Sequence, residues 1–325
     1  MALPPKRRTN VAAGAHTLRT LLADAHGRLR RARLSYGHGT TNAWDEAVYL
    51  SLFALRLPPD RLTPHLDRQL TAAQSARALK LIETRISRRI PAAYITREAW
   101  LGDERFYVDE RVIVPRSYIA ELLRDRLAPW VVRPARVKRV LDLCTGSGCL
   151  AILLAKCFTG AVVDAVDISR PALAVARRNV AAHGLAHRIR LIESDLFSAL
   201  QAEPYDLIVS NPPYVSAARM KALPREYRHE PQLALAGGTD GFSLVRIILR
   251  EASHRLSARG LLVVEIGHHR RRLEALYPRT PFMWPETSGG DDCVFIVGRT
   301  DLEVQARPAP QPHRATPAGA ASRRR

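Results

Sequence analysis

The sequence predicts an α/β protein with a smaller helical part before it, and three observations support this architecture. From about residue 136 to residue 300, short apolar runs alternate with helix-like segments, as in a mostly parallel sheet. Before residue 90, apolar residues recur at helical spacing instead. The chain has 325 residues, which is enough for both parts. We therefore expect a Rossmann-like, mostly parallel sheet preceded by a small helical domain.

The helical part is indicated by repeated apolar residues and by its boundary residues. Asn42 followed by Asp45 is typical of a helix start. Pro91 is expected to end a third helix, because proline cannot continue the backbone hydrogen-bond ladder. The apolar residues at helical spacing are Leu18, Leu21, Leu22, Ala25 and Leu29, followed by Ala47, Leu50, Phe53, Ala54 and Leu57.

The chain accordingly divides into five parts. Both ends are expected to be disordered, since the first is short and basic and the last is rich in Pro, Ala and Arg. A β-hairpin linker is expected between the two domains. In order, the basic tail, helical domain, hairpin linker, sheet domain and C-terminal tail are 1–12, 13–90, 91–117, 118–300 and 301–325.

A glycine-rich turn follows the first strand of the sheet domain, the apolar run at 140–143. Glycines let the backbone approach a ligand, and the N–H groups of the next helix favour an anionic or strongly accepting group. Residues 146–151 also satisfy the dinucleotide-binding pattern, and Asp167 follows near the spacing of a ribose-binding acid. A nicotinamide-dependent dehydrogenase is therefore an open alternative. The residues of the turn are Thr145, Gly146, Ser147 and Gly148.

Acidic residues stand near the carboxyl ends of three strands, where open α/β sheets bind ligands. Asp142 precedes the glycines, where a carboxylate repels a pyrophosphate but suits the ammonium of a methionine moiety, so its charge favours S-adenosylmethionine. Asp167 is expected to bind the ribose hydroxyls. Asp195 is expected to accept from the adenine amino group, beside Leu196 and Phe197. Each acid alone is equally well explained as a turn or cap residue, and their combination carries the prediction.

The strand at 205–210 ends in Asn211, Pro212, Pro213 and Tyr214, a sequence suited to hold a planar NH₂ group. The Asn211 side-chain carbonyl and the Pro212 backbone carbonyl can each accept one N–H. Consecutive prolines keep the segment extended, so that these carbonyls point outward. Tyr214 can stack on the flat amide. Because an amide nitrogen is a weak nucleophile, we expect Asn211, Pro212 and Tyr214 to hold it for direct, in-line methyl transfer.

From about residue 37 to residue 299, the sequence resembles the class I methyltransferases that methylate the side-chain amide of glutamine and carry an Asn-Pro-Pro-Tyr motif. Three further segments resemble the branch that acts on large-subunit ribosomal protein L-three: 36–40, 44–47 and 106–117. The branch that acts on release factors carries an acid and a threonine within positions 118–120, so it is the alternative. The resemblance implies a class I fold with a seven-stranded, mostly parallel sheet. It also implies S-adenosylmethionine as the methyl donor and residues 13–90 as the substrate-recognition domain.

The same resemblance assigns individual residues. It implies that Asn211 to Tyr214 hold the glutamine, and that Glu230 lies in a loop beside the substrate entrance, for which a solvated loop charge is the alternative. Two positions depart from the family: Cys144 replaces a common glycine, and Leu196 stands where a tryptophan often lines the adenine pocket. Both departures imply a different cofactor pocket. The cofactor contacts expected in all are Asp142, Thr145, Gly146, Ser147, Gly148, Asp167, Asp195, Leu196 and Asn211.

The formal net charge is +19, and the tails account for only part of it. Residues 13–90 hold thirteen Lys and Arg against six Asp and Glu, a net charge of +7. Such an excess favours a polyanionic neighbour, for which ribosomal RNA in an assembling subunit is the candidate. An arginine-rich composition bias is an equal alternative, and the sequence shows no aromatic platform for reading RNA.

Two further function classes remain open, together with the question of a metal site. The amide clamp also suits an amino group on an RNA or DNA base, and a non-catalytic, cofactor-gated assembly factor is conceivable. The four cysteines form no C-x-x-C pair, so we expect reduced thiols and no metal site. No signal peptide or long apolar stretch is apparent, which predicts a cytoplasmic protein without a membrane partner. These cysteines are Cys144, Cys149, Cys157 and Cys293.

Overall fold

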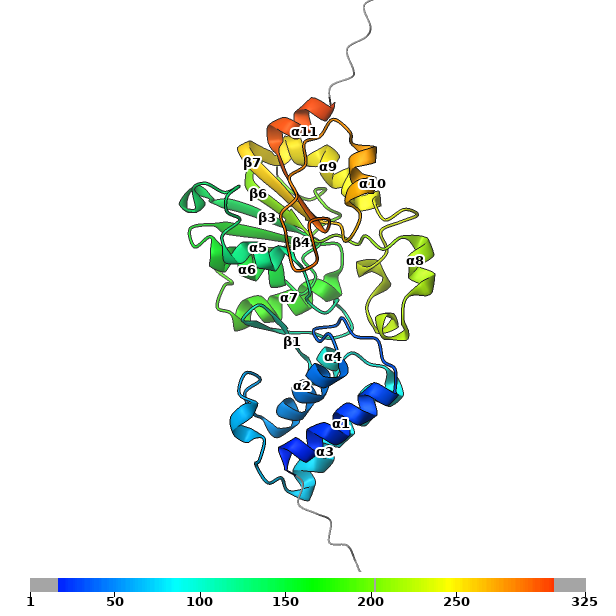
Figure 1. Ribbon diagram of the computed structural model, residues 1–325. Helices are drawn as coiled ribbons and strands as arrows, with labels where there is room; N and C mark the ends of the chain where they lie inside the picture. The colour runs from blue at the N-terminus through cyan, green and yellow to red at the C-terminus, as the bar shows by residue number, and fades with distance from the viewer. Residues whose placement is uncertain (1–16, 202, 307–325) are drawn as a thin grey trace, which may run out of the picture.

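The computed structural model describes residues 17–201 and 203–306, and it places a helical domain against one end of a sheet domain (Figure 1). The expected N-terminal tail, 1–12, and residues 307–325 of the expected C-terminal tail, 301–325, lie outside the described residues. No helix in the described part of the chain has the length and apolar character needed to cross a membrane. The helices before the sheet domain are α1 (Leu18–Arg31), α2 (Ala43–Leu55), η1 (Thr63–His65), α3 (Ala72–Arg88) and α4 (Ala92–Thr96).

Local sequence signals start the first helices. The Asn42 side chain accepts hydrogen bonds from the backbone N–H groups of Trp44 and Asp45, both at 2.9 Å, so the predicted start of α2 is confirmed. Thr71 and Gln74 form a reciprocal capping box at the start of α3. These caps satisfy N–H groups that a helix start leaves without partners.

The linker contains a helix as well as the expected hairpin. α3 ends at Arg88, and Arg89 adopts a left-handed conformation with φ of 58°, so the chain leaves the helix before Pro91. Pro91 instead precedes α4, because its fixed φ suits a helix start. The prediction that Pro91 ends the third helix is therefore wrong. The hairpin is present but shorter than expected, with β1 (Glu98–Leu101) antiparallel to β2 (Glu104–Tyr107).

The sheet domain has the expected α/β architecture. Its strand order is β5-β4-β3-β6-β7-β8, and every pairing is parallel except that of β8 with β7. The strands are β3 (Arg139–Leu143), β4 (Val162–Asp167), β5 (Ile189–Glu193), β6 (Tyr205–Ser210), β7 (Leu256–Glu265) and β8 (Val294–Gly298). The helices are α5 (Ile119–Arg124), η2 (Pro134–Arg136), α6 (Cys149–Cys157), α7 (Arg170–Ala182), α8 (Ala217–Ala222), η3 (Arg225–His229), η4 (Gln232–Ala234), α9 (Ser243–Arg255), α10 (Arg270–Leu276) and α11 (Arg299–Ala306).

Alternating side chains of each strand build two cores. Val140 and Val209 face α5 and α6, whereas Leu141 and Ile208 face α9, α10 and α11. Both sets are fully buried, which explains why the strands read as continuous apolar runs in the sequence. The carboxyl ends of β3, β4 and β6 are thereby fixed side by side between the two helical layers (Figure 1).

The sheet has six strands within the described residues, one fewer than expected. Beside β8, Met283 makes an isolated antiparallel bridge with Ile296, with N···O distances of 2.9 and 2.8 Å. Pro281 and Pro285 flank this bridge and have no N–H group to extend a ladder. The expected seventh strand is therefore reduced to a single bridge.

The folded body also continues past the expected boundary at residue 300. α11 runs to Ala306, and its Leu302 is only 3% exposed, in the same core as α9. The expectation that the disordered tail begins at residue 301 is therefore wrong, because one leucine in a polar segment anchors a further helix.

A buried ion network joins the helical domain to the sheet domain. The Arg85 guanidinium on α3 is 1% exposed and donates to a Glu46 carboxylate oxygen at 2.6 Å and to the Ser35 backbone carbonyl at 2.8 Å. Its third contact is Glu226 of η3, at 3.5 Å. Glu226 also accepts from the Ser35 backbone N–H and from Arg89. One buried cation thus connects α2, α3 and the loop after β6.

We expect Arg85→Ala to lower the free energy of unfolding by about 3–5 kcal/mol, because removal of one partner leaves buried, uncompensated carboxylates. Urea denaturation of the whole chain measures this change. The control is Arg77→Ala on the same helix, where the side chain is exposed and the change should stay within about 0.5 kcal/mol. A loss below about 1 kcal/mol in Arg85→Ala would contradict this role.

Candidate active site at the carboxyl edge of the sheet

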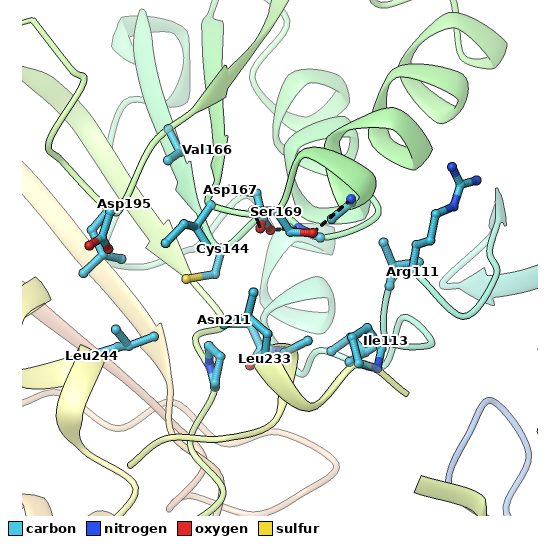
Figure 2. A pocket seen from close by; sticks show the side chains of 18 of the residues that line it. Arg111, Ile113, Cys144, Val166, Asp167, Ser169, Asp195, Asn211, Leu233 and Leu244 are labelled. Atoms are coloured by element: carbon cyan, nitrogen blue, oxygen red, sulfur yellow. Dashed lines mark hydrogen bonds between the residues drawn. The ribbon is translucent and has the colours of Figure 1, made fainter. Parts of the chain in front are cut away.

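A cavity of about 150 Å³ opens where β3, β4 and β6 end. Figure 2 shows Asp195, Cys144 and Asn211 around the same space. Apolar side chains form much of its wall: Val166, Ile168, Leu196, Leu233 and Leu244. Of the residues predicted to contact the cofactor, those that line the cavity are Gly146, Asp167, Asp195, Leu196 and Asn211.

Asp167 fixes the shape of the cavity floor. One carboxylate oxygen accepts from the Gly146 backbone N–H at 2.8 Å. The other accepts from the Ser169 backbone N–H, also at 2.8 Å (Figure 2). Burial raises the pKa of Asp167, although these backbone hydrogen bonds oppose the rise. Asp167 therefore ties the glycine-rich turn to the start of α7, while Asp195 at the end of β5 is exposed.

Four predicted cofactor residues do not line this cavity. Gly148 is positioned for packing: its φ is 79°, and an added Cβ would lie 3.1 Å from the Ala176 Cβ on α7. The Ser147 carbonyl accepts from the Asn179 side chain at 2.9 Å. These contacts hold the turn against α7. The four residues are Asp142, Thr145, Ser147 and Gly148.

Asp142 is fully buried below the turn. Its Oδ2 accepts from the Thr145 hydroxyl at 2.6 Å, whereas its Oδ1 has no hydrogen-bond partner among the described residues. Burial raises the pKa of Asp142 to about 7. A buried carboxylate oxygen without a partner is costly unless a ligand supplies a donor.

The two departures from the family pattern share a backbone feature. Cys144 and Leu196 both line the cavity, and both adopt left-handed conformations, with φ of 61° and 46°. Such a conformation costs a non-glycine residue roughly 1–2 kcal/mol. The backbone therefore keeps a glycine-like turn at residue 144 although a cysteine is present.

A second cavity of about 260 Å³ adjoins the first. Pro212 and Tyr214 line it, as do Arg116, Tyr118 and Tyr227. The residues that line both cavities are Ile113, Asn211, Pro213 and Ala234. Asn211 therefore stands at the junction between a pocket with carboxylates at strand ends and a pocket with aromatic walls.

Glu265, at the end of β7, holds Tyr214 in place. Its buried carboxylate accepts from the Tyr214 hydroxyl at 3.2 Å, from the Ser117 hydroxyl at 2.6 Å and from the Tyr118 backbone N–H at 2.9 Å. Burial raises the pKa values of both Glu265 and Tyr214. Gly267 leaves room for the ring, because an added Cβ would lie 3.0 Å from Tyr214 Cε2. Tyr214 is thus a fixed, protonated wall of the second cavity.

Glu230 is buried rather than a solvated loop charge, and it lines neither cavity itself although its loop lines both. Its carboxylate is buried, pairs with Arg116 at 2.5 and 2.7 Å, and accepts from the Val114 backbone N–H at 3.0 Å. His38 of the helical domain lies 3.6 Å away. Burial alone would raise the pKa of Glu230, but the Arg116 charge and hydrogen bonds hold it near 2. Glu230 therefore positions Arg116, which itself lines the second cavity.

Sequence reasoning missed several cavity residues. The Arg116 guanidinium lies over the Tyr227 ring, 5.5 Å from its centroid. Tyr118, which directly precedes α5, lines the same cavity. Arg116 lies in the segment 106–117, which supported the family resemblance, but the sequence analysis assigned no role to Arg116 itself. Tyr227 had no signal, because it reaches the cavity only through the fold of η3.

A further side-chain cluster was also not apparent from spacing. Potential ligand atoms of His268, Asp292 and Cys293 lie within 4.8 Å of one another, although no metal site was expected. His268 Nδ1 lies 2.9 Å from Asp292 Oδ1 and 3.4 Å from Cys293 Sγ. These mutual hydrogen bonds account for the cluster, and all four cysteines are free thiols.

Comparison with known proteins agrees with this geometry. The family model of the methyltransferase small domain matches residues 122–225. The chain is 56% identical to the ribosomal protein uL3 glutamine methyltransferase of Bordetella pertussis over 89% of this chain and 97% of the relative. It is 54% identical to the protein of that name from Neisseria gonorrhoeae, over 88% of this chain and 95% of the relative.

The chain belongs to the ribosomal protein uL3 glutamine methyltransferase family. This family membership confirms the resemblance predicted from the sequence, the class I methyltransferase fold and S-adenosylmethionine as methyl donor. It also removes the dehydrogenase alternative that the glycine pattern had left open. The roles of individual residues rest on the geometry described above.

We expect the stability of the ligand-free protein to depend on Asp142 protonation. The folded-state pKa of Asp142 is raised from 3.8 to about 7, so the protonated carboxyl stabilises the folded protein at low pH. This stabilisation is lost as pH rises through 7. Relative to Asp142→Asn, wild type should lose about 3 kcal/mol of unfolding free energy between about pH 4.5 and about pH 8.

Urea denaturation at both pH values measures that difference. The matched control is Asp60→Asn at an exposed position, which should leave the pH dependence of wild type unchanged. Parallel pH profiles for wild type and Asp142→Asn would show that Asp142 is ionised throughout, and the prediction would be wrong.

Proposed function

We propose that this protein methylates the side-chain amide nitrogen of a glutamine in ribosomal protein uL3, with S-adenosylmethionine as the donor. The observation that carries this proposal is the position of Asn211, which lines both adjoining cavities. A methyltransferase must bring donor and acceptor together in line, and among the four residues that line both cavities Asn211 is the one with a polar side chain. The names of the relatives supply the acceptor, a glutamine of uL3.

The described residues fit the donor. Asp167 and Asp195 offer carboxylates at strand ends for hydroxyl and amino groups, and Leu196 offers an apolar wall for a ring. Asp142 does not line this cavity, but its buried Oδ1, which has no partner among the described residues, is the kind of acceptor that the ammonium group of the donor would require. When bound, S-adenosylmethionine supplies an electrophilic methyl group on a sulfonium centre.

The chain's own residues prepare the acceptor. The Asn211 side-chain carbonyl and the Pro212 backbone carbonyl each accept one amide N–H, and Tyr214, held by Glu265, stacks on the amide plane. This arrangement contributes orientation rather than deprotonation, because the amide nitrogen can lose its proton after it has been methylated. Pro213 completes the shared wall between the cavities.

The surroundings of the reaction form part of the same proposal. Residues 13–90 would recognise the substrate, 91–117 would connect them to the catalytic domain, and the excess positive charge would lie near ribosomal RNA in an assembling subunit. A ribosomal-protein substrate is consistent with a cytoplasmic reaction.

We expect Asn211→Ala to lower single-turnover methyl transfer at least tenfold, because loss of one acceptor leaves an amide N–H unpaired at a cost of about 1–3 kcal/mol. Donor binding, followed by calorimetry with S-adenosylhomocysteine, should largely survive. The matched control is Gln232→Ala, an exposed amide on η4 in the neighbouring loop. An unchanged transfer rate in Asn211→Ala would show that Asn211 does not hold the acceptor amide.

The acceptor itself is tested by peptide mass mapping of large-subunit proteins from cells with and without this gene. One glutamine of uL3 should lose a methyl group in the deletion strain and regain it with purified enzyme and labelled donor. Label in a release factor or in ribosomal RNA would support the proposed role of Asn211 to Tyr214 in holding a planar NH₂ group. It would show that uL3 is not the acceptor.

A further inference from the structure

A groove of about 810 Å³ lies on the helical domain, far larger than either active-site cavity. The end of α2, the exposed side of α3 and the β1–β2 hairpin form its walls. None of its lining residues belongs to the cavities around Asn211. The groove is therefore a separate surface of the molecule.

Two aromatic side chains line the groove from different elements. Phe53 of α2 is 38% exposed and Trp100 of β1 is 37% exposed, whereas large apolar side chains are normally buried. The Trp100 indole N–H donates to Glu98 at 3.1 Å, which fixes the plane of the ring. The sequence showed no aromatic platform, because these residues are 47 positions apart and meet only in the fold.

The same groove carries cations that have no carboxylate partner within the described residues: Arg56, Arg77 and Lys80. The fourth cation, Arg105, pairs with Glu98, the only acid of the groove. The groove therefore has a net positive charge beside exposed rings.

We propose that this groove binds a single-stranded segment of RNA. Arg56, Arg77 and Lys80 would contact phosphates, while Trp100 and Phe53 would stack on bases. An acidic peptide would satisfy the cations but would leave the two rings without a partner of matching shape, so the combination favours RNA. This inference rests on the proposed function, in which ribosomal RNA surrounds the substrate.

Helix α3 connects the groove to the active-site side of the molecule. Arg77 and Lys80 lie on α3, and the same helix carries Arg85, whose buried network reaches Glu226 in the loop after β6. RNA held on α3 would therefore orient the whole enzyme toward a glutamine in the nearby protein without touching the catalytic residues.

Fluorescence anisotropy with a labelled single-stranded RNA of about 12 nucleotides tests the proposal, since single-strand sites span roughly 4–16 nucleotides. The combined change Arg56→Gln, Arg77→Gln and Lys80→Gln should weaken binding at least tenfold and reduce the slope of log affinity against log salt by about 2. Trp100→Ala should weaken binding about tenfold, and Trp100→Tyr should restore most of it.

The matched control is Arg124→Gln, Arg136→Gln and Lys138→Gln, three exposed cations of the sheet domain, which should leave RNA affinity within about twofold. Equal loss in this control would show non-specific attraction to a basic protein and would overturn the proposal. Methyl transfer to free uL3 is followed in parallel, so that loss of RNA binding is distinguished from loss of the protein substrate.

Two outcomes separate this inference from the proposed function. If the groove variants lose methyl transfer to free uL3 but keep RNA affinity, the groove binds the protein substrate and the RNA proposal is wrong. If wild type and all variants fail to methylate uL3 while the groove variants alone lose RNA binding, the RNA site stands and the proposed function falls.

Discussion

The buried carboxylate of Glu230 is the interaction on which the active site depends. It joins three segments that are distant in the sequence: His38 of the helical domain, Val114 with Arg116 before α5, and the loop that begins with Pro231. Arg116 lines the second cavity, for which we propose the acceptor, and Pro231 lines the first, for which we propose the donor. Because the loss of either partner of a buried ion pair is strongly destabilising, this pair stabilises the position of the Pro231 loop relative to the segment that carries Arg116.

A second buried carboxylate, that of Glu226, lies four residues before Glu230 and accepts from Arg85, Arg89 and the Ser35 backbone N–H. Both acids lie in the segment after the Asn-Pro-Pro-Tyr motif, and both reach back to the helical domain. The loop that closes over the acceptor is therefore anchored by buried charges rather than by an apolar core of its own. Charges require defined partners and directions, so such anchors specify one loop conformation among many of similar apolar area.

Local signals were readable in the sequence, whereas distant pairings were not. Asn42 at the start of α2 follows from short-range cap chemistry, and Asn211 followed from the strand before it and the prolines after it. Glu230 and Arg116 are 114 positions apart, so neither residue reveals the other. Asp142 shows the same limit, because its place below the turn, away from the donor cavity wall, depends on how β3 meets α6.

The separation of the two cavities explains why the chain needs a rigid acceptor side. A donor cavity with apolar walls can form from the sheet alone, since β3, β4 and β6 end at one edge. An amide acceptor brings no charge and little nucleophilicity, so catalysis must come from orientation. Orientation requires that Tyr214 does not move, and Glu265 holds it from the far side with a carboxylate that also holds Ser117 and Tyr118 at the start of α5. In the proposed reaction, the helical domain, the loop after β6 and the sheet therefore all help to orient one planar group, the acceptor amide.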